Sequence, residues 1–236
     1  MKKKNFKVVI LCGGLGSRLS EETKKIPKPM IRIGKLPILI HIMNIYKKHG
    51  FKDFILALGY KKKIIIDYFK EKKLKNINVQ LVDTGKNSLT GTRLLKLKKF
   101  IKNDNFLLTY GDGLGDINLN KLLKFHIKNN KVATITAVRP PARFGELFLR
   151  KNLVKKFEEK NQVNSGWING GFFIFKKKIF KFIPKKSCML EKDPMNKLAL
   201  KKELVAYKHK SFWQCMDTIR DKELLNRIWK SGKSRW

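Results

Sequence analysis

The first half of the chain alternates short apolar runs with stretches whose apolar residues recur at helical spacing. Five runs are typical of buried strands, at residues 7–12, 53–58, 79–82, 106–110 and 132–138. Helices are predicted from Pro37 onward and at 64–69, 91–101 and 119–127, where 91–101 would turn Leu94, Leu95, Leu97 and Ile101 inward. Such alternation indicates a mostly parallel sheet with helices on both faces.

The second half has a different pattern, with short strands predicted at 147–149, 154–157 and 172–175 and helices at 197–202 and 220–229. No linker or internal repeat divides the 236 residues. Domains average about 150 residues, so this length fits one large domain. We therefore expect a single α/β domain over residues 1–236. Residues 1–140 would form a Rossmann-like sheet, and 141–236 a smaller α+β elaboration.

The formal net charge of +37 raises the question of nucleic-acid binding. The 55 basic residues are 46 Lys and only nine Arg, scattered along the whole chain. Proteins that read nucleic acids favour Arg, because its guanidinium makes bidentate contacts. Abundant Lys, Asn, Ile and Phe instead indicate a genome with A/T-rich codons. A positive field would still gather phosphorylated substrates.

The cysteines and histidines predict no metal centre and no disulfide framework. Cys12, Cys188 and Cys215 lie far apart, and the four His show no ligand spacing. No apolar run approaches the roughly 18 residues of a membrane span. The apolar stretch at 8–12 is also shorter than a signal peptide requires. We therefore expect a cytoplasmic protein.

A glycine-rich segment follows the first predicted strand directly. It reads Leu-Cys-Gly-Gly-Leu-Gly-Ser-Arg over residues 11–18. Glycines allow a tight turn in which backbone N–H groups converge on phosphate oxygens. Neither the dinucleotide fingerprint nor the Walker loop fits, because Arg18 stands where the first needs Gly and no Gly-Lys-Ser/Thr follows. An arginine here suggests a cationic clamp on a polyphosphate.

Three charged residues stand out by their neighbours. Lys28 lies between two prolines, which should hold it extended and rigid. Asp112 lies between two glycines at the end of a predicted strand, where a metal-bound triphosphate could approach. Asp217 could complete a Mg²⁺ site with Asp112. It could equally cap the helix that follows.

These motifs, in this order, resemble those of the sugar-1-phosphate nucleotidyltransferases over nearly the whole chain. The matching segments are 13–23, 27–30, 37–43, 82–85, 90–94, 109–113, 143–145, 157–160, 168–173 and 212–218. Thr-Gly-Thr-Arg (90–93), Ile-Asn-Gly-Gly-Phe-Phe (168–173) and Met-Asp-Thr (216–218) are similar to the cytidylyl branch. Differences from the family pattern are a shorter segment 70–81, Asn161 after Glu-Lys, and Ser17 for Thr.

The resemblance implies a GT-A-like fold, with nucleotide bound by 1–140 and sugar phosphate by 141–236. The residues implied at the nucleotide are Leu11, Cys12, Gly13, Gly14 and Leu15 for base and ribose, Gly16, Ser17 and Arg18 for the triphosphate, and Ser88, Arg93 and Gly111. Lys28 would contact the phosphates, Lys160 the sugar phosphate and Asn169 the sugar. Asp112 and Asp217 would ligate Mg²⁺, and catalysis would rest on Arg18, Lys28 and Asp112.

The implied reaction joins CTP and α-D-glucose 1-phosphate into CDP-glucose and diphosphate, with Mg²⁺ as cofactor. The implied setting is a homo-oligomer that serves lipopolysaccharide O-antigen biosynthesis without binding nucleic acid or membrane. Alternatives are uridylyl, thymidylyl or guanylyl transfer, or another phosphorylated acceptor. A silent nucleotide-binding subunit is disfavoured by the presence of both Asp112 and Asp217. A nucleic-acid binder is disfavoured by the excess of Lys over Arg.

Overall fold

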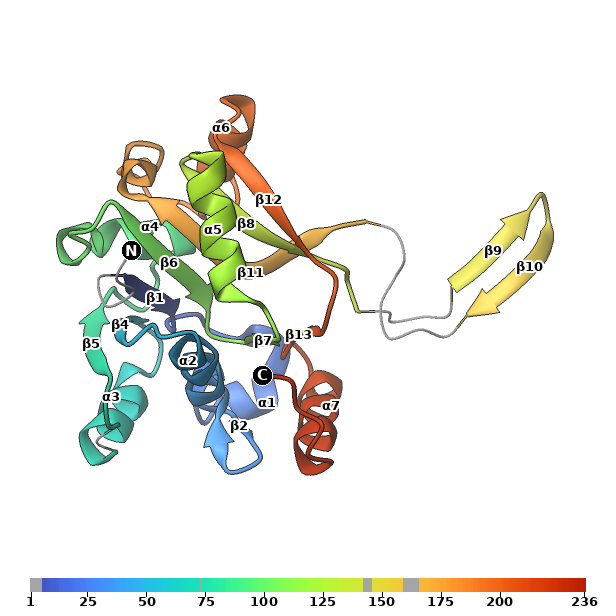
Figure 1. Ribbon diagram of the computed structural model, residues 1–236. Helices are drawn as coiled ribbons and strands as arrows, with labels where there is room; N and C mark the ends of the chain where they lie inside the picture. The colour runs from blue at the N-terminus through green and yellow to red at the C-terminus, as the bar shows by residue number, and fades with distance from the viewer. Residues whose placement is uncertain (1–5, 73, 142–145, 159–165) are drawn as a thin grey trace.

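The computed structural model describes residues 6–72, 74–141, 146–158 and 166–236. Its centre is a seven-stranded sheet in the order β12-β8-β11-β6-β1-β4-β5. The strands are β1 (Lys7–Leu11), β4 (Asp53–Leu58), β5 (Asn78–Asp83), β6 (Asn105–Tyr110), β8 (Ala133–Val138), β11 (Ile168–Lys176) and β12 (Leu204–His209). Only β11 runs antiparallel to its two neighbours. The expected mostly parallel α/β fold is confirmed (Figure 1).

Helices cover both faces of this sheet. The helices are α1 (Ser20–Thr23), α2 (Ile38–Lys48), α3 (Lys62–Glu71), α4 (Thr90–Lys96), α5 (Leu119–Asn129), α6 (Asp193–Leu200) and α7 (Ile219–Lys230). Alternate residues of a strand point to opposite faces. Val8 and Ile10 accordingly join the core under α2, α3, α5 and α7, whereas Val9 and Leu11 join the core under α4 and α6. No helix in these described ranges is long and apolar enough to cross a membrane.

Most predicted elements are present, with shifted ends. The helix expected at 91–101 is wrong in extent, because α4 stops at Lys96 and a separate 3₁₀ turn, Lys98–Phe100, follows. Leu94, Leu97 and Ile101 are buried as expected despite this break, whereas Leu95 is only partly buried. The helix expected at 197–202 begins earlier, at Asp193, because Pro194 suits the first turn of a helix. The segment 70–81, expected to be shorter than in the family pattern, includes the end of α3 at Glu71 and the start of β5 at Asn78.

Several short strands were not predicted. β2 (Arg32–Ile33) pairs with β3 (Leu36–Pro37), and β7 (Gly113–Gly115) pairs with β13 (Trp213–Cys215). The hairpin of β9 (Glu146–Arg150) and β10 (Leu153–Glu158) matches the two strands expected there, and it forms a sheet of its own. The β7–β13 pair matters most for function, because it joins segments about a hundred residues apart beside the end of β6.

The carboxyl ends of the parallel strands place the candidate catalytic segments of the chain at one edge of the sheet. The glycine-rich loop follows β1, and Gly111-Asp112-Gly113 follows β6, the strand paired with β1. A Cβ on Gly111 would come within 2.9 Å of both the Leu11 carbonyl oxygen and Pro29 Cγ. The three motifs expected from the sequence therefore pack against one another because residue 111 lacks a side chain.

Candidate active site

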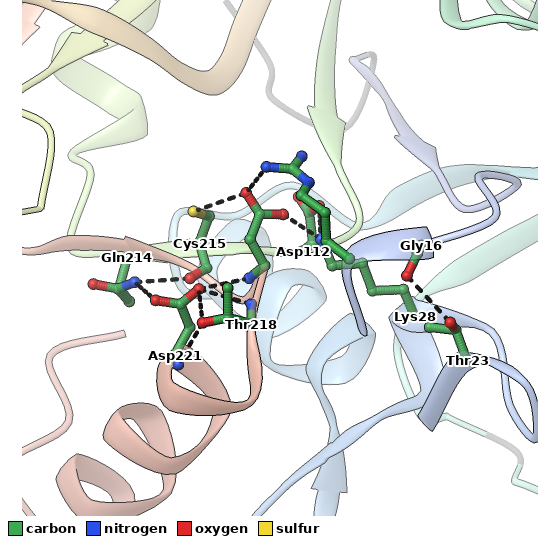
Figure 2. Close-up of polar contacts among 10 residues, drawn as sticks. Gly16, Thr23, Lys28, Asp112, Gln214, Cys215, Thr218 and Asp221 are labelled. Carbon is green, nitrogen blue, oxygen red and sulfur yellow. Dashed lines mark hydrogen bonds and ion pairs between the residues drawn. The ribbon is translucent and has the colours of Figure 1, made fainter. Parts of the chain in front are cut away.

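The glycine-rich loop is closed by Thr23, a residue that the sequence did not single out. The Thr23 hydroxyl lies 3.1 Å from the Gly16 carbonyl oxygen and 2.9 Å from that of Leu19. Gly16 has φ +68°, which favours glycine, and a Cβ there would lie 2.8 Å from Thr23 Cγ2. Gly14, Leu15 and the following residues at 17–18 remain exposed. The loop is thus held from one side by Thr23, whose contact with Gly16 is drawn in Figure 2, and is exposed on the other.

Arg93 holds the same loop from inside the protein. Its buried guanidinium donates to the carbonyl oxygen of Gly13 at 2.6 Å, to Leu58 at 3.0 Å and to the Thr84 hydroxyl at 2.7 Å. It also reaches the carbonyls of Gly85 and Lys86. Arg93 therefore clamps the loop after β1 to the turn after β5, and its contact with a nucleotide stays a prediction.

Ser88 belongs to the turn that Arg93 clamps. Its hydroxyl donates to the Thr84 carbonyl oxygen at 2.5 Å and accepts from Lys96 Nζ at 3.0 Å. These contacts bring Ser88 to the same edge of the sheet as the loop after β1. Its contact with a nucleotide also stays a prediction.

Lys28 lies at the centre of the charged cluster. Its Nζ is 2.7 Å from Asp112 Oδ2 and 2.6 Å from Asp217 Oδ1 (Figure 2). The expected extended conformation of Lys28 is wrong, because Pro27 is extended but Lys28 opens the 3₁₀ turn Lys28–Met30. A proline early in such a turn costs no hydrogen bond, since the first N–H groups have no partner within the turn. The turn aims the Lys28 side chain between the two carboxylates.

The β7–β13 pair explains how Asp112 and Asp217 meet. Gly113 pairs with Cys215, and the Met216 N–H donates to the Asp112 carbonyl oxygen at 2.8 Å. Both carboxylates then face the Lys28 ammonium, although they are far apart in the sequence. Arg18 Nη1 lies 2.7 Å from Asp217 Oδ2, and its side chain is 70% exposed, so it can turn toward a ligand.

Helix capping does not engage the Asp217 carboxylate. Thr218 is the N-cap of α7, and its side chain accepts from the Asp221 N–H. The Asp221 carboxylate in turn accepts from the N–H groups of Asp217 and Thr218. Of the two roles left open by the sequence, capping thus belongs to Thr218 and Asp221 (Figure 2).

The charges of the cluster support one another. Burial opposes the charged form of Lys28, but the neighbouring Asp112 and Asp217 carboxylates raise the pKa of Lys28 overall. Burial likewise opposes the charged form of Asp217, but Lys28 and Arg18 lower the pKa of Asp217 overall. The opposite charges of Lys28 and Asp217 therefore favour the charged form of each other despite their burial.

The donor set fits a magnesium ion that is shared with a substrate. The described residues contain no group of three or more His, Cys, Asp or Glu side chains that could hold a metal alone. Mg²⁺ is commonly bound by one or two carboxylates together with substrate phosphates and water. A cation, the Lys28 ammonium, already lies between the Asp112 and Asp217 oxygens, so these two side chains converge on one cation.

The remaining predicted residues divide between this edge and the undescribed part of the chain. Asn169 lies at the start of β11 and donates to the Tyr110 hydroxyl at 3.1 Å, two residues from Asp112. Lys160 lies outside the described residues. Tyr110 and Glu191, whose side chains are 2.5 Å apart, were missed by sequence reasoning. Of these two residues, only Tyr110 could have been found from the sequence, because it directly precedes the Gly-Asp-Gly motif at 111–113.

Comparison with known proteins agrees with this geometry. A family model described as "Nucleotidyl transferase" matches residues 7–222. Glucose-1-phosphate cytidylyltransferase of Salmonella typhimurium is 43% identical over 253 residues, covering 98% of each chain, and the Salmonella typhi enzyme of that name matches to the same extent. The solved structure of HddC from Yersinia pseudotuberculosis with GMP-PN has a TM-score of 0.75 and 27% identity, covering 95% of this chain and 99% of that one. On these grounds the chain belongs to the nucleotidyl transferase family.

Proposed function

We propose that this protein transfers a cytidylyl group from CTP to α-D-glucose 1-phosphate, giving CDP-glucose and diphosphate. The observation that carries the proposal is the buried Lys28 held between Asp112 and Asp217 beside an open glycine-rich loop. The choice of CTP and glucose rests on the Salmonella relatives, whose identity extends over 98% of the chain.

The reaction needs positioned charge more than an acid or a base. The acceptor phosphate is already an anion, and its oxygen attacks the α-phosphorus in line with the departing diphosphate. Repulsion between these anions forms the barrier, so Lys28 and the exposed Arg18 would stabilise the charge that develops on the phosphates. Mg²⁺ on Asp112 and Asp217 would supply further neutralisation when bound. Cys12 is buried, and burial raises the pKa of its thiol, which disfavours the thiolate that a nucleophilic cysteine requires.

The other proposed roles follow the same division of the chain. Residues 11–15, Ser88, Arg93 and Gly111 would form the nucleotide side, and Lys160 and Asn169 the acceptor side. Strands from both halves build one seven-stranded sheet, which supports a single domain. We also propose a cytoplasmic homo-oligomer that binds neither nucleic acid nor membrane and whose product serves O-antigen synthesis.

A diphosphate-release assay across the four NTPs, each with a panel of sugar 1-phosphates, tests the proposal. We expect the highest kcat/KM for CTP with glucose 1-phosphate. Guanylyl transfer is the alternative with a specific observation behind it, because the similar Yersinia protein was solved with GMP-PN. A kcat/KM for UTP, dTTP or GTP at or above that for CTP refutes cytidylyl transfer. No diphosphate release with any pair refutes nucleotidyl transfer to sugar phosphates altogether.

Gly14→Ala should weaken the preference for CTP over UTP without harming the fold. Cytosine carries an amine where uracil carries a carbonyl oxygen, so backbone acceptors near the base leave buried groups unpaired when UTP binds. A Cβ on Gly14 meets no protein atom within 4 Å, and its φ is not positive, so the methyl would push only the base. The measurement is the CTP/UTP ratio of kcat/KM together with the melting temperature.

Two further variants serve as controls for Gly14→Ala. Lys86→Ala changes an exposed neighbour of the nucleotide side and should keep the CTP preference. Gly13→Ala should lower the melting temperature, because its Cβ would lie 2.1 Å from Arg93 Nη1. An unchanged CTP/UTP ratio in Gly14→Ala contradicts base reading by this loop.

A further inference from the structure

A chain of hydrogen bonds connects α4 to the start of β11 through Glu191. The Thr90 hydroxyl donates to Glu191 Oε2 at 2.6 Å, and the Tyr110 hydroxyl donates to Glu191 Oε1 at 2.5 Å. Asn169 Nδ2 then donates to the Tyr110 hydroxyl at 3.1 Å. Four side chains from four separate segments of the sequence, Thr90, Tyr110, Asn169 and Glu191, are thereby linked beside Asp112.

Both hydroxyl donors of this chain, on Thr90 and Tyr110, are used within it. Each Glu191 oxygen accepts one of these bonds, one from the Thr90 hydroxyl and one from the Tyr110 hydroxyl. The Asn169 carbonyl oxygen accepts from the Gly171 N–H at 2.8 Å. A primary amide carries two N–H donors. Within the described part of the chain, one N–H of the half-buried Asn169 amide has no partner and is left for a ligand.

The backbone around Asn169 is shaped to hold this arrangement. The pairing of β11 with β8 is irregular between Asn169 and Phe173, as in a β-bulge. Gly171 has φ +75°, and a Cβ there would lie 2.7 Å from Tyr110 Cδ2. Glycine at 171 thus lets the Tyr110 ring approach the strand, so that its hydroxyl meets the Asn169 amide.

Glu191 is itself held in place by the Thr-Gly-Thr-Arg segment. The Thr90 hydroxyl accepts from the Leu190 N–H at 2.8 Å, and the Thr92 hydroxyl accepts from the Cys188 N–H at 3.0 Å. The Gly91 N–H donates to the Cys188 carbonyl oxygen at 3.1 Å, and a Cβ on Gly91 would lie 2.7 Å from Cys188 Sγ. The two threonines therefore dock the segment 188–191 onto α4 and fix the carboxylate that follows.

We propose that Glu191 is a positioning residue for the acceptor, which fixes the Tyr110 hydroxyl and through it aims the free Asn169 N–H at a hydroxyl of the sugar 1-phosphate. The proposal rests on the proposed function, because it takes the acceptor to be a sugar phosphate bound beside Asn169. Glu191 acts through Tyr110, because the Tyr110 hydroxyl connects the Glu191 carboxylate to the Asn169 amide.

Steady-state kinetics of Glu191→Gln and Tyr110→Phe, alone and combined, test the role. Each single variant should raise the KM for the sugar 1-phosphate about tenfold, the loss expected for one well-aimed hydrogen bond. The kcat and the Kd for the nucleotide, measured by calorimetry with the NTP that the wild type uses best, should change less than about threefold. The double variant should be no worse than the worse single variant, because both act through the same amide.

Two controls separate positioning from general stability. Glu203 is another partly buried carboxylate, which accepts from the Val132 N–H and directly precedes β12. Glu203→Gln should leave the KM for the sugar 1-phosphate unchanged. Thr90→Ser keeps the hydroxyl that holds Glu191 and should retain that KM, whereas Thr90→Val should raise it.

The possible outcomes are distinct. Single-variant effects that multiply in the double variant, or a nucleotide Kd that weakens as much as the sugar-phosphate KM, overturn the positioning role. Unchanged KM values in both variants of an active enzyme overturn it too, while leaving the proposed function intact. If none of the sugar 1-phosphates tested supports diphosphate release by the wild-type protein, the proposed function is refuted and this role is refuted with it.

Discussion

Asp112→Asn should lower diphosphate release by roughly 10³-fold while the fold survives, as expected when a group that neutralises charge on transferring phosphates is lost. The amide keeps the shape of the carboxylate but removes its charge from the site shared with Asp217. Lys28 stays paired, because its second contact, to Asp217 Oδ1, is 2.6 Å long. The measurement is turnover at matched Mg²⁺, alongside the melting temperature and calorimetric binding of Mn²⁺ with CTP.

Asp116→Asn provides the matched control for this prediction. Asp116 lies four residues further along the same segment, but its carboxylate accepts from the Ser211 hydroxyl and does not face Lys28. Its replacement should leave turnover within a few-fold of wild type. Turnover like the wild type in Asp112→Asn would remove Asp112 from the metal site.

Asp217→Asn should show a loss comparable to that of Asp112→Asn. Its carboxylate faces Lys28 and Arg18, while Thr218 and Asp221 cap α7. Helix capping therefore no longer competes as an explanation. A fall in melting temperature without a fall in turnover would point back to a structural role for Asp217.

Lys28→Ala should reduce kcat by roughly 10²-fold or more, as removal of one preorganised charge-stabilising group does. The residue is 9% exposed and is aimed by the Pro27–Met30 turn, so no neighbouring lysine can take its place. The variant also leaves Asp112 and Asp217 without their shared ammonium, so the protein should melt at a lower temperature in the absence of Mg²⁺ and CTP.

Lys24→Ala is the control that separates geometry from general positive charge. Lys24 is exposed and lies four residues before Lys28, so its loss should change kcat little. Arg18→Ala should resemble Lys28→Ala in turnover, because Arg18 also faces Asp217 at the loop. Equal losses in Lys24→Ala and Lys28→Ala would mean that the overall charge of the chain, and not the site, drives the rate.

Elements whose signals are local were predictable. The strands β1, β4 and β6 and the helix α2 follow from apolar runs and helical periodicity, because burial of these side chains dictates the period. The glycine-rich loop and Gly-Asp-Gly were predictable for the same reason, since turn chemistry acts over a few residues. The motif resemblance then pointed to nucleotidyl transfer, in agreement with the family match over residues 7–222.

Elements that exist only through their partners could not be predicted. β7 and β13 are three residues each, too short for a period, and they are strands only because they pair with one another. The break between α4 and the turn at Lys98–Phe100 likewise follows from packing, which buries Leu94, Leu97 and Ile101 at once. No local propensity encodes either outcome.

The amino-acid sequence by itself determined the class of fold, the loop after β1 and the charged residues available for catalysis, because local patterning and residue chemistry decide these. Only the tertiary structure decided what those residues do. It placed Lys28 between Asp112 and Asp217 and brought Glu191 to Tyr110. The physical reason is distance along the chain. Contacts between residues 80 to 190 positions apart arise only when sheet pairing aligns their strand ends, and no pattern within one segment carries that information.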